Sequence, residues 1–493
     1  KKLIYLKDKS ACMPLIESIS GIRGIYDNGL NEKTAARYAY SYISSLKSRI
    51  TKKKKSYNQN NLKIVIGTDT RPSKDILKNT ILEVLDCDII DVGIASTPMV
   101  EFAVRYYKAD GGIVITASHN EPYWNGFKFL DKDGAVLRPK YMEKVIEKYN
   151  KIKTLDGKVF YNKHLYKNNN RNELTIKKIY KKHDEVNDAY SGYILSFLSN
   201  EDRTRIKNSK LKIIIDPNGG TGIIAKKILE KLNVVVYGIN MEYGIFNRVV
   251  EPNEDSLIYL ANTVRDKKYD FAAGFDCDAD RVEIMTEKGI VSGNHILALI
   301  ADNILKNTKN KAVVVNDATS NIVKDIAKKH NAKYIETGVG EINVVDKIYE
   351  LNAPVGGEGS SSGTIIPPSR CRDGILTLVY LLKIIAKTGK SFNELIRALP
   401  EYYNIKNKIA ISTKDYGKIR KKLKDYYKKK NFKIKDSEET GSLKAISGKN
   451  FVWFRASKTE ADILRIITDS NNKKEAGLLM EDAMHKVNIF SKK

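Results

Sequence analysis

The sequence predicts three consecutive doubly wound α/β domains followed by a smaller C-terminal α+β domain. At 493 residues the chain is too long for one hydrophobic core and suggests about three or four domains. Short apolar runs alternate with helical patterns up to about residue 398, which indicates parallel strands joined by helices. Charged helices and a short strand pair are expected after that point. The predicted domains are residues 1–160, 184–288, 289–398 and 400–493, with a Lys- and Asn-rich connector near residues 150–183.

The first domain contains three apolar runs that are typical of buried parallel strands, at residues 62–67, 88–93 and 112–116. Helices are expected between these strands, at residues 73–85 and 98–107. The third strand leads directly into Ser118 and His119, with Lys128 ten residues beyond the serine. Open α/β sheets place their chemistry at the carboxyl ends of strands, although Ser, His and Asn are also ordinary turn residues.

Arg23 lies ahead of these strands in the segment Ser-Gly-Ile-Arg-Gly, residues 20–24. The small neighbours let this loop approach a ligand closely, and a planar guanidinium suits a phosphate group. Taken alone, an arginine between glycines is weak support for a site.

The second domain begins with a helix near residues 188–198 and a strand at residues 211–216. Its apolar run at residues 271–275 delivers Asp276, Asp278 and Asp280, which are followed by Arg281. Carboxylates at every second residue point the same way on an extended segment. Like charges so close repel one another unless a cation lies among them, and hard oxygen ligands suit Mg²⁺. An acidic surface loop is the less favoured alternative, because a buried strand precedes the carboxylates.

The third domain shows the same alternation, with helices expected at residues 295–305 and 321–329 and strands at residues 311–315, 333–336 and 354–357. Glu358 opens a glycine- and serine-rich run that ends at Gly363. A strand precedes this run and a long apolar helix follows it, so a ligand loop is favoured over a linker.

The last domain contains Arg455-Ala-Ser-Lys-Thr459 between two apolar runs. Guanidinium, ammonium and hydroxyl donors on one turn are suited to a phosphate dianion, and an ordinary surface turn is the alternative.

These stretches resemble, in order, the signature loops of the α-D-phosphohexomutase family, and the overall look is that of an archaeal member. TASHNEPYWNGFK is similar to the phosphoserine loop, SGIRG to an arginine loop that reaches the transferring phosphate, and DCDADR to the metal loop. GEGSSSG is similar to the sugar-binding loop, and RASKTE to the phosphate-binding loop. The resemblance covers nearly the whole chain, with Cys277 where the family usually has glycine.

The resemblance implies four domains around a central cleft and a mutase that interconverts hexose 1-phosphate and hexose 6-phosphate. Ser118 would be carried as phosphoserine, with hexose 1,6-bisphosphate as intermediate and activator. Mg²⁺ would be held by the phosphoserine oxygen and by Asp276, Asp278 and Asp280. Arg23 and Lys128 would stabilise charge on the transferring group. His119 is the candidate general acid/base because imidazole titrates near neutral pH, and Lys128 competes for that role.

The resemblance also implies the substrate contacts. Arg281 would bind substrate, Glu358 and Ser360 would bind sugar hydroxyls, and a clamp would hold the phosphate that does not react. The clamp residues are Arg455, Ser457, Lys458 and Thr459. Ser362 stands where the family has a histidine, so the acid–base role of that histidine does not carry over.

Phosphoglucosamine is the favoured substrate, and mannose or glucose phosphates are the alternatives. A metal-dependent phosphatase that hydrolyses the phosphoserine is a further alternative within the enzymes. The expected partner is a small sugar phosphate, and the oligomeric state is not predicted.

The net charge of +27 suggests an alternative from a different functional class, a basic nucleic-acid-binding protein on a mutase scaffold. Its lysines lie in stretches such as 52–55 and 421–430, away from the motifs, and the sequence shows no nucleic-acid-binding module. A solvated lysine-rich surface is therefore favoured.

Because no apolar run reaches the ~20 residues that span a bilayer, we expect no membrane association and a cytoplasmic location. The four cysteines show no CxxC pair, which argues against a zinc site or a disulfide framework.

Overall fold

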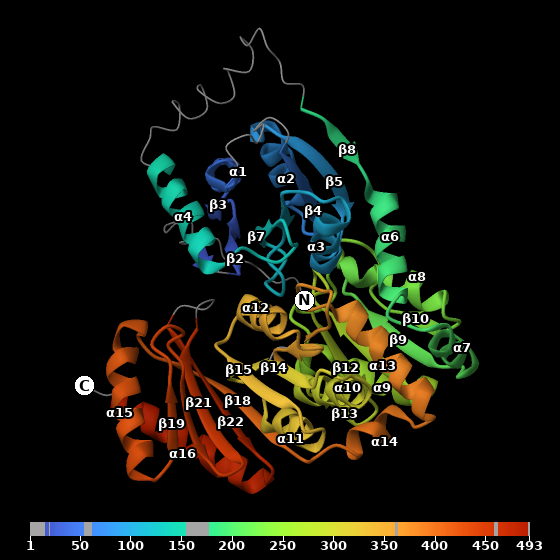
Figure 1. Ribbon diagram of the computed structural model, residues 1–493. Coiled ribbons are helices and arrows are strands. Elements are labelled where there is room, and N and C mark those ends of the chain that lie inside the picture. Colours follow the sequence, from blue (N-terminus) through green and yellow to red (C-terminus); the bar gives the residue numbers. More distant parts are fainter. Residues whose placement is uncertain are drawn as a thin grey trace.

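The computed structural model describes residues 15–18, 20–53, 62–153, 177–359, 363–457 and 462–491. Each quarter of the chain builds its own β-sheet with helices packed against it. Figure 1 shows the first quarter in blue at the top and the last in red at the lower left. The predicted class of three α/β domains and a C-terminal α+β domain is confirmed.

The first domain has an eight-stranded sheet whose main path is β1-β2-β7-β6-β4-β5-β8, with β3 paired to β2. Its strands are β1 Ile16–Ser18, β2 Gly21–Tyr26, β3 Gly29–Leu30, β4 Lys63–Thr68, β5 Asp88–Ile94, β6 Gly111–Ile115, β7 Trp124–Asp131 and β8 Ile179–Lys181. Its helices are α1 Glu32–Lys53, α2 Lys74–Val84, α3 Thr97–Tyr106 and α4 Pro139–Lys153. The sheet is mixed rather than purely parallel, because β7 runs antiparallel to β6.

Alternation along the strands decides which helices cover which face of this sheet. Ile64 and Ile66 of β4 pack with α1, α2 and α4, whereas the intervening Val65 packs with α3. Sheet and helices therefore form a doubly wound sandwich. The expected connector contributes a strand as well, since β8 pairs in parallel with β5, and residues 154–176 lie outside the described part of the chain.

The second and third domains have smaller mixed sheets, in the orders β10-β9-β11-β12-β13 and β15-β14-β16-β17. The strands are β9 Lys212–Asp216, β10 Val235–Gly238, β11 Phe271–Phe275, β12 Val282–Thr286, β13 Gly289–Val291, β14 Ala312–Asn316, β15 Lys333–Thr337, β16 Val355–Gly357 and β17 Thr364–Ile365. The helices are α6 His183–Leu195, α7 Asn200–Asn208, α8 Ile224–Glu230, α9 Glu254–Lys267, α10 Gly293–Asn307, α11 Asn321–Lys329, α12 Glu341–Leu351, α13 Gly374–Thr388 and α14 Phe392–Arg397.

The last domain is a five-stranded antiparallel sheet in the order β18-β22-β21-β20-β19, which is larger than the expected short strand pair. The strands are β18 Tyr403–Ala410, β19 Lys433–Asp436, β20 Leu443–Ser447, β21 Asn450–Ala456 and β22 Ile463–Ser470. Helices α15 Tyr416–Lys429 and α16 Lys473–Ser491 pack against it. Lysines occupy alternate positions of β18 and β19, so these strands contain no continuous apolar run by which they could be predicted.

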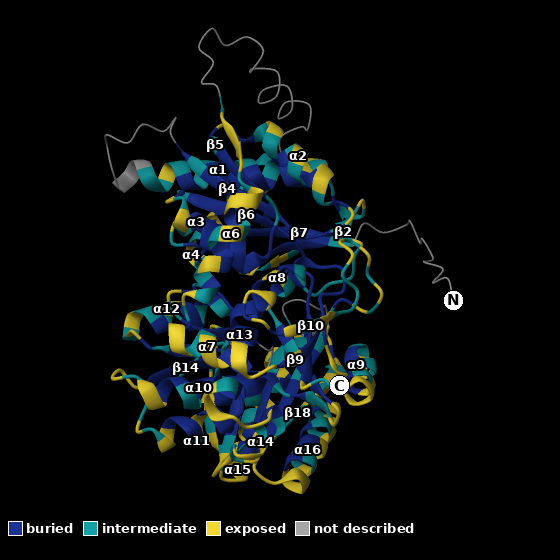
Figure 2. Ribbon diagram, turned by 90° about the vertical axis from the view of Figure 1, so that its right-hand side faces the viewer, coloured by how far each residue is buried: buried dark blue, intermediate teal, exposed yellow. Residues whose placement is uncertain are grey.

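One hydrophobic core runs through the first three domains, whereas the last domain has a core of its own. A small cluster joins the last domain to the third, in which Phe451, Trp453 and Ile467 pack around Ala318. Figure 2 shows strands β4, β6 and β7 of the first domain as buried ribbons. The first three domains thus form one packed body. The fourth is joined to the third by this small apolar cluster and by polar contacts, such as those of Ser442 with Asp317 and of Lys444 with Glu336.

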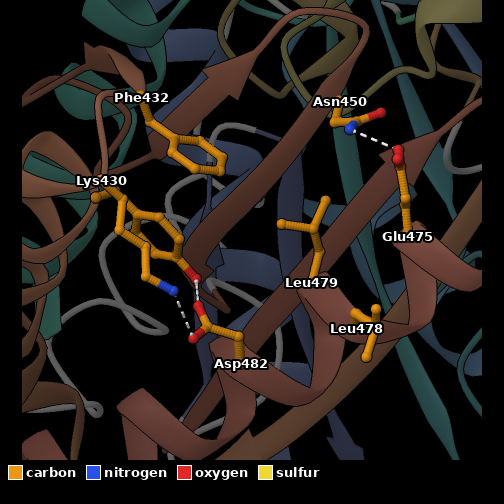
Figure 3. A pocket seen from close by; sticks show the side chains of 8 residues that line it. Lys430, Phe432, Asn450, Glu475, Leu478, Leu479 and Asp482 are labelled. Atoms are coloured by element: carbon orange, nitrogen blue, oxygen red, sulfur yellow. Dashed lines mark hydrogen bonds and ion pairs between the residues drawn. The ribbon is translucent and has the colours of Figure 1, made fainter.

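Two surface pockets lie away from all the predicted site residues. One, of about 280 Å³, lies between the end of α15 and α16, where the Asp482 carboxylate accepts hydrogen bonds from Tyr427 and Lys430 (Figure 3). The other, of about 450 Å³, lies between α1 and α4 and is lined by Arg49 and Lys148 among others. Within the described ranges, no helix is long and apolar enough to cross a bilayer.

Candidate active site

Ser118 lies in the loop after β6 with 1% of its surface exposed. Its φ of 53° is in the left-handed region, which is uncommon for a residue other than glycine. Its backbone N–H donates to Thr116 Oγ1 at 2.8 Å, and its Oγ donates to Asp276 Oδ2 at 3.1 Å. The turn therefore directs the serine hydroxyl from the first domain toward the carboxylates of the second.

Asp276, Asp278 and Asp280 are fully buried, and one oxygen from each lies within 4.8 Å of the others. The predicted convergence of the carboxylates is confirmed, but the segment that carries them is not extended. The chain turns tightly after β11, and Ala279 has a φ of 52°. Oδ1 of Asp278 and Oδ1 of Asp280 have no hydrogen-bond partner among the described residues. Because buried carboxylate oxygens need a partner and hard oxygens suit divalent cations, this cluster fits Mg²⁺.

Burial and the neighbouring charges shift the pKa values of Asp276 and Asp280 in opposite directions. Burial raises the pKa of Asp276 well above its usual value, and the neighbouring Asp280 and Asp278 raise it further. Burial also acts to raise the pKa of Asp280, but Lys128, Arg372 and Arg281 lower it more strongly. A bound cation would favour the ionised form of all three carboxyl groups.

Lys128 of β7 donates from Nζ to Asp278 Oδ2 at 2.8 Å and to Asp280 Oδ2 at 3.0 Å. Burial lowers the pKa of this ammonium, but the two carboxylates outweigh burial and raise it above its ordinary value. Thr97, at the start of α3, also donates to Asp278 Oδ2, at 2.6 Å. Lys128 is therefore a fixed positive charge in this arrangement, and its affinity for its proton disfavours it as a base.

His119 Nδ1 lies 3.5 Å from Ser118 Oγ. Burial lowers the pKa of the imidazole well below 6.5, and the positive charges of Arg281, Arg23 and Arg465 add to this effect. The ring is therefore neutral at pH 7 in this arrangement, whereas the predicted acid/base role concerns an imidazole beside a phosphate group. A neutral imidazole can still accept a proton.

Arg23 and Arg281 place positive charge near the serine loop and the carboxylate cluster. Arg23 of β2 donates from Nη1 to Asn120 Oδ1 at 2.8 Å, and burial together with Arg281 lowers its pKa to about 10, so it stays charged at pH 7. Arg281 Nε lies 3.6 Å from Asp280 Oδ1 and 4.0 Å from Asp276 Oδ2. Both cations thus lie beside the carboxylate cluster, where a phosphate group would need them.

Glu358 follows β16 in the third domain and is buried. Its Oε1 accepts hydrogen bonds from Asn316 Nδ2 at 2.9 Å and from the Gly340 N–H at 3.0 Å. Arg372 Nη1 lies 3.3 Å from Glu358 Oε2. Ser360 and Ser362 lie outside the described residues.

Arg372 is a site residue that the sequence reasoning missed. It donates to Glu341 Oε2 at 2.9 Å and to Asp280 Oδ2 at 3.4 Å, in addition to its ion pair with Glu358. One guanidinium therefore connects the carboxylate cluster of the second domain with the glutamate of the third. Its position two residues before the first residue of helix α13 was the available signal in the sequence.

The last domain presents a row of cations across three strands. Arg455 of β21 pairs with Arg465 of β22, and Arg465 pairs with Lys408 of β18. Directly opposed residues of antiparallel strands share a face of the sheet. The Ser457 N–H donates to the Ile463 carbonyl at 2.7 Å and thereby closes the turn between β21 and β22. Lys458 and Thr459 lie outside the described residues.

Direct contacts thus join seven predicted site residues of the first two domains, and Arg23 lies near enough to lower the pKa of His119. The seven residues are Ser118, His119, Lys128, Asp276, Asp278, Asp280 and Arg281. Glu358 joins them through Arg372. Arg465 of the last domain lies near enough to lower the pKa of His119, although no direct contact joins Arg455 to the serine among the described residues.

Two further residues beneath the serine loop were also missed, Asp69 and Arg71, which follow the carboxyl end of β4. An acid and an arginine two residues apart at the end of a buried strand were the signal for them.

Three family descriptions match the chain in succession. They are phosphoglucomutase/phosphomannomutase alpha/beta/alpha domain I over residues 16–156, domain II over residues 189–289 and domain III over residues 292–403. The order and positions of the matches follow the three α/β domains of the structure.

Individual proteins are similar over nearly the whole chain. A phosphoglucomutase/phosphomannomutase from Thermococcus kodakarensis is 33% identical over 471 residues, which cover 94% of this chain and 96% of the relative. A phosphoglucosamine/phosphogalactosamine mutase from Sulfurisphaera tokodaii is 30% identical over 442 residues, covering 86% and 90%. The open form of the phosphoglucomutase pp63/parafusin from Paramecium superposes with a TM-score of 0.79 at 19% identity, covering 97% of this chain and 95% of that one. This last similarity concerns the fold alone.

Proposed function

Because the chain belongs to the phosphoglucomutase/phosphomannomutase family, we propose that it interconverts hexose 1-phosphates and hexose 6-phosphates through a phosphoserine at position 118. Family membership makes the protein a phosphohexomutase, which is an isomerase. The observation that carries the proposed mechanism is the 3.1 Å hydrogen bond from Ser118 Oγ to Asp276, one of three clustered buried carboxylates.

In the proposed first half-reaction, the C6 hydroxyl of a hexose 1-phosphate attacks the phosphorus of phosphoserine. The new phosphorus–O6 bond forms as the phosphorus–Oγ bond to Ser118 breaks. The proton lost by the hydroxyl passes to the neutral imidazole of His119 and ends on Ser118 Oγ, so the step is neutral in protons. After the bisphosphate reorients, the reverse chemistry at C1 returns a phosphoryl group to Ser118 and releases the 6-phosphate.

The assignment of the base follows from the surroundings of the two candidates. Lys128 is held as an ammonium between two carboxylates, so it has no lone pair with which to accept a proton. His119 is neutral and lies within 3.5 Å of the serine oxygen. We therefore assign proton transfer to His119 and charge stabilisation to Lys128 and Arg23.

A divalent cation, Mg²⁺ in this proposal, would be held by Asp276, Asp278, Asp280 and the phosphoserine oxygen and would neutralise charge on the transferring phosphoryl group. Two carboxylate oxygens, Asp278 Oδ1 and Asp280 Oδ1, have no hydrogen-bond partner among the described residues, which supports this assignment. With the cation bound, Lys128 would share the carboxylates with it rather than neutralise them alone.

The substrate contacts come from three domains in this proposal. Arg281 of the second domain would bind substrate, and Glu358 and Ser360 of the third would bind sugar hydroxyls. Arg455, Ser457, Lys458 and Thr459 would hold the second phosphate. Because this clamp must accept either end of the sugar, the last domain, which has its own core, is the natural element to move between the two half-reactions.

We propose glucosamine phosphate as the preferred sugar, with mannose and glucose phosphates as alternatives. The amino-sugar mutase from Sulfurisphaera supports the first choice, and the relative from Thermococcus supports the alternatives. A small sugar phosphate in the cytoplasm is the proposed partner, rather than nucleic acid or membrane.

Phosphorus NMR of the purified protein with Mg²⁺ and a trace of hexose 1,6-bisphosphate tests the proposal. Glucosamine, mannose and glucose 1-phosphates are supplied separately, and conversion to a 6-phosphate establishes the mutase and ranks the sugars. Steady release of inorganic phosphate without conversion would instead favour the phosphatase. Absence of both reactions, together with salt-sensitive binding to DNA or RNA, would favour the nucleic-acid-binding alternative.

A further inference from the structure

We infer that Arg71 is a positioning residue for the nucleophile, because it holds the Ser118 loop in the backbone conformation that turns the serine oxygen toward Asp276. The inference rests on the proposed role of Ser118 and extends it to a residue that does not touch the reacting atoms. Arg71 follows β4, whereas the loop that it contacts follows β6.

The Arg71 side chain is fully buried and uses all five of its N–H donors. Nε donates to Asp69 Oδ2 at 2.9 Å. The other four hydrogen bonds go to backbone carbonyls of one loop, those of Ser118 at 2.6 Å, Asn120 at 2.7 Å, Glu121 at 2.6 Å and Trp124 at 3.2 Å. A single guanidinium therefore binds four backbone carbonyl groups between Ser118 and Trp124, the first residue of β7.

Asp69 extends this support to the other side of Ser118. Its Oδ1 accepts the Arg71 backbone N–H at 3.0 Å, and its Oδ2 accepts Thr116 Oγ1 at 2.7 Å as well as Arg71 Nε. Thr116 Oγ1 in turn accepts the Ser118 N–H at 2.8 Å. The two peptide groups that flank the Ser118 side chain are thus fixed, one through Thr116 and the other through Arg71.

Such support is needed because Ser118 has a φ of 53°, a conformation that costs free energy for any residue with a Cβ. Strained backbone of this kind persists only where its surroundings enforce it. In an ordinary extended conformation the Cα–Cβ bond of Ser118 would point elsewhere, and its hydroxyl would leave Asp276.

Lysine cannot replace arginine in this position. Its ammonium has three donors on one atom, whereas the planar guanidinium directs five donors at separate acceptors. A lysine at position 71 keeps the charge beside Asp69 but leaves several of the four loop carbonyls without a donor. The charge itself is secure in the native protein, since burial lowers the pKa of Arg71 but Asp69 raises it above its ordinary value.

The arrangement predicts a particular kinetic effect. Arg71 contacts neither the sugar loop of the third domain nor the cations of the last domain in the described structure, so substrate binding should be preserved when it changes. Misplacing the nucleophile by as little as 1 Å can lower the rate of reaction about 100-fold. Loss of Arg71 should therefore lower kcat and spare KM.

The first test compares Arg71→Lys with Arg49→Lys. Arg49 is a matched control in the same domain, since it also pairs with an aspartate, Asp131, at 2.6 and 2.8 Å, but it does not contact the loop. With the sugar phosphate that the wild type converts, Arg71→Lys should lower kcat about 100-fold with KM changed less than about threefold, while Arg49→Lys keeps both near wild type. Circular dichroism and thermal melting verify that each variant is folded.

A second pair of variants decides the question if Arg71→Lys does not fold. Thr116→Val removes the acceptor of the Ser118 N–H at nearly constant volume, and Thr116→Ser retains it. We expect kcat to fall about 10-fold or more in Thr116→Val and to recover in Thr116→Ser, because only the second keeps the hydrogen bond.

Different results would contradict the proposed mutase function and the positioning role of Arg71. A wild type without mutase activity contradicts the proposed function. An active wild type whose folded Arg71→Lys variant keeps its kcat, or whose Thr116→Val and Thr116→Ser variants are equally active, contradicts the positioning role.

Discussion

Lys128 Nζ donates to Asp278 Oδ2 at 2.8 Å, a contact that joins β7 of the first domain to the carboxylate cluster of the second. Thr97 of the first domain reaches the same oxygen at 2.6 Å. These contacts between the two domains therefore fix the position of the carboxylate cluster relative to the first domain. Changes at this junction should affect metal affinity and catalysis together.

Ser118→Ala should abolish turnover and remove the phosphoserine signal from the phosphorus NMR spectrum, because alanine offers no oxygen to carry the phosphoryl group. The fold should persist, since Arg71 and Thr116 bind only the backbone of residue 118. Retained mutase activity in protein free of wild type would falsify the role of Ser118.

Asp278→Asn should raise the Mg²⁺ concentration needed for half-maximal activity by at least about 10-fold, since one of three clustered charges is lost. Asp302→Asn is the control, because Asp302 bonds to Lys329 and His330 outside the site. An unchanged Mg²⁺ titration for Asp278→Asn would argue against the metal assignment.

The His119 ring should titrate below pH 6.5 in the unphosphorylated enzyme, because burial and the neighbouring arginines lower its pKa. The unfolded chain binds this proton more tightly, so the contribution of His119 to stability is complete above pH 6.5 and is lost as the pH falls toward the folded-state pKa. Histidine NMR titration checks the value, with His119→Gln to assign the resonance. Phosphorylation of Ser118 should raise this pKa again, and a ring that titrates above pH 6.5 before phosphorylation would contradict the structure.

Arg372→Met should destabilise the protein by about 3 kcal/mol in urea unfolding, because it leaves Glu341, Glu358 and Asp280 without their shared cation. Arg397→Met, at the exposed end of α14, should change the free energy of unfolding by less than about 0.5 kcal/mol. Equal effects of the two substitutions would show that the buried ion pairs contribute little.

Arg455→Ala should raise KM about 10- to 100-fold with a smaller effect on kcat, since a hydrogen bond to a charged group contributes about 1.5–3 kcal/mol. Arg420→Ala in the same domain is the control, because Arg420 pairs with Asp436 on the outer side of β19. If kcat fell while KM stayed constant, Arg455 would act on the transferring phosphate instead of the second one.

The sequence predicted helices and strands best where a whole strand, or one face of a helix, is buried. The predicted strand at residues 271–275 coincides with β11, and the predicted helix at residues 321–329 coincides with α11, which Ser320 caps. These elements are recognisable because an apolar run or a helical period ends at a clear polar boundary. The alternating lysines of β18 carry no such signal, so the last sheet was largely missed.

Within the site, the sequence identified side chains that face the chemistry but not those that hold them in place. Ser118 and the three aspartates lie together as their motifs suggested, whereas Arg71 and Arg372 were missed. The partners of Arg71 are backbone carbonyls, which every residue has, and those of Arg372 come from different domains. Contacts of either kind become visible only after the chain has folded.

The separate core of the last domain also has a thermodynamic consequence. A segment whose apolar side chains pack mainly with one another is a cooperative unit of its own, so local and global opening need not coincide. Calorimetry should accordingly resolve more than one transition, and amide hydrogens of β18–β22 should exchange independently of those in β4–β6. The proposed second phosphate site would then be lost on heating before the body that carries the serine unfolds.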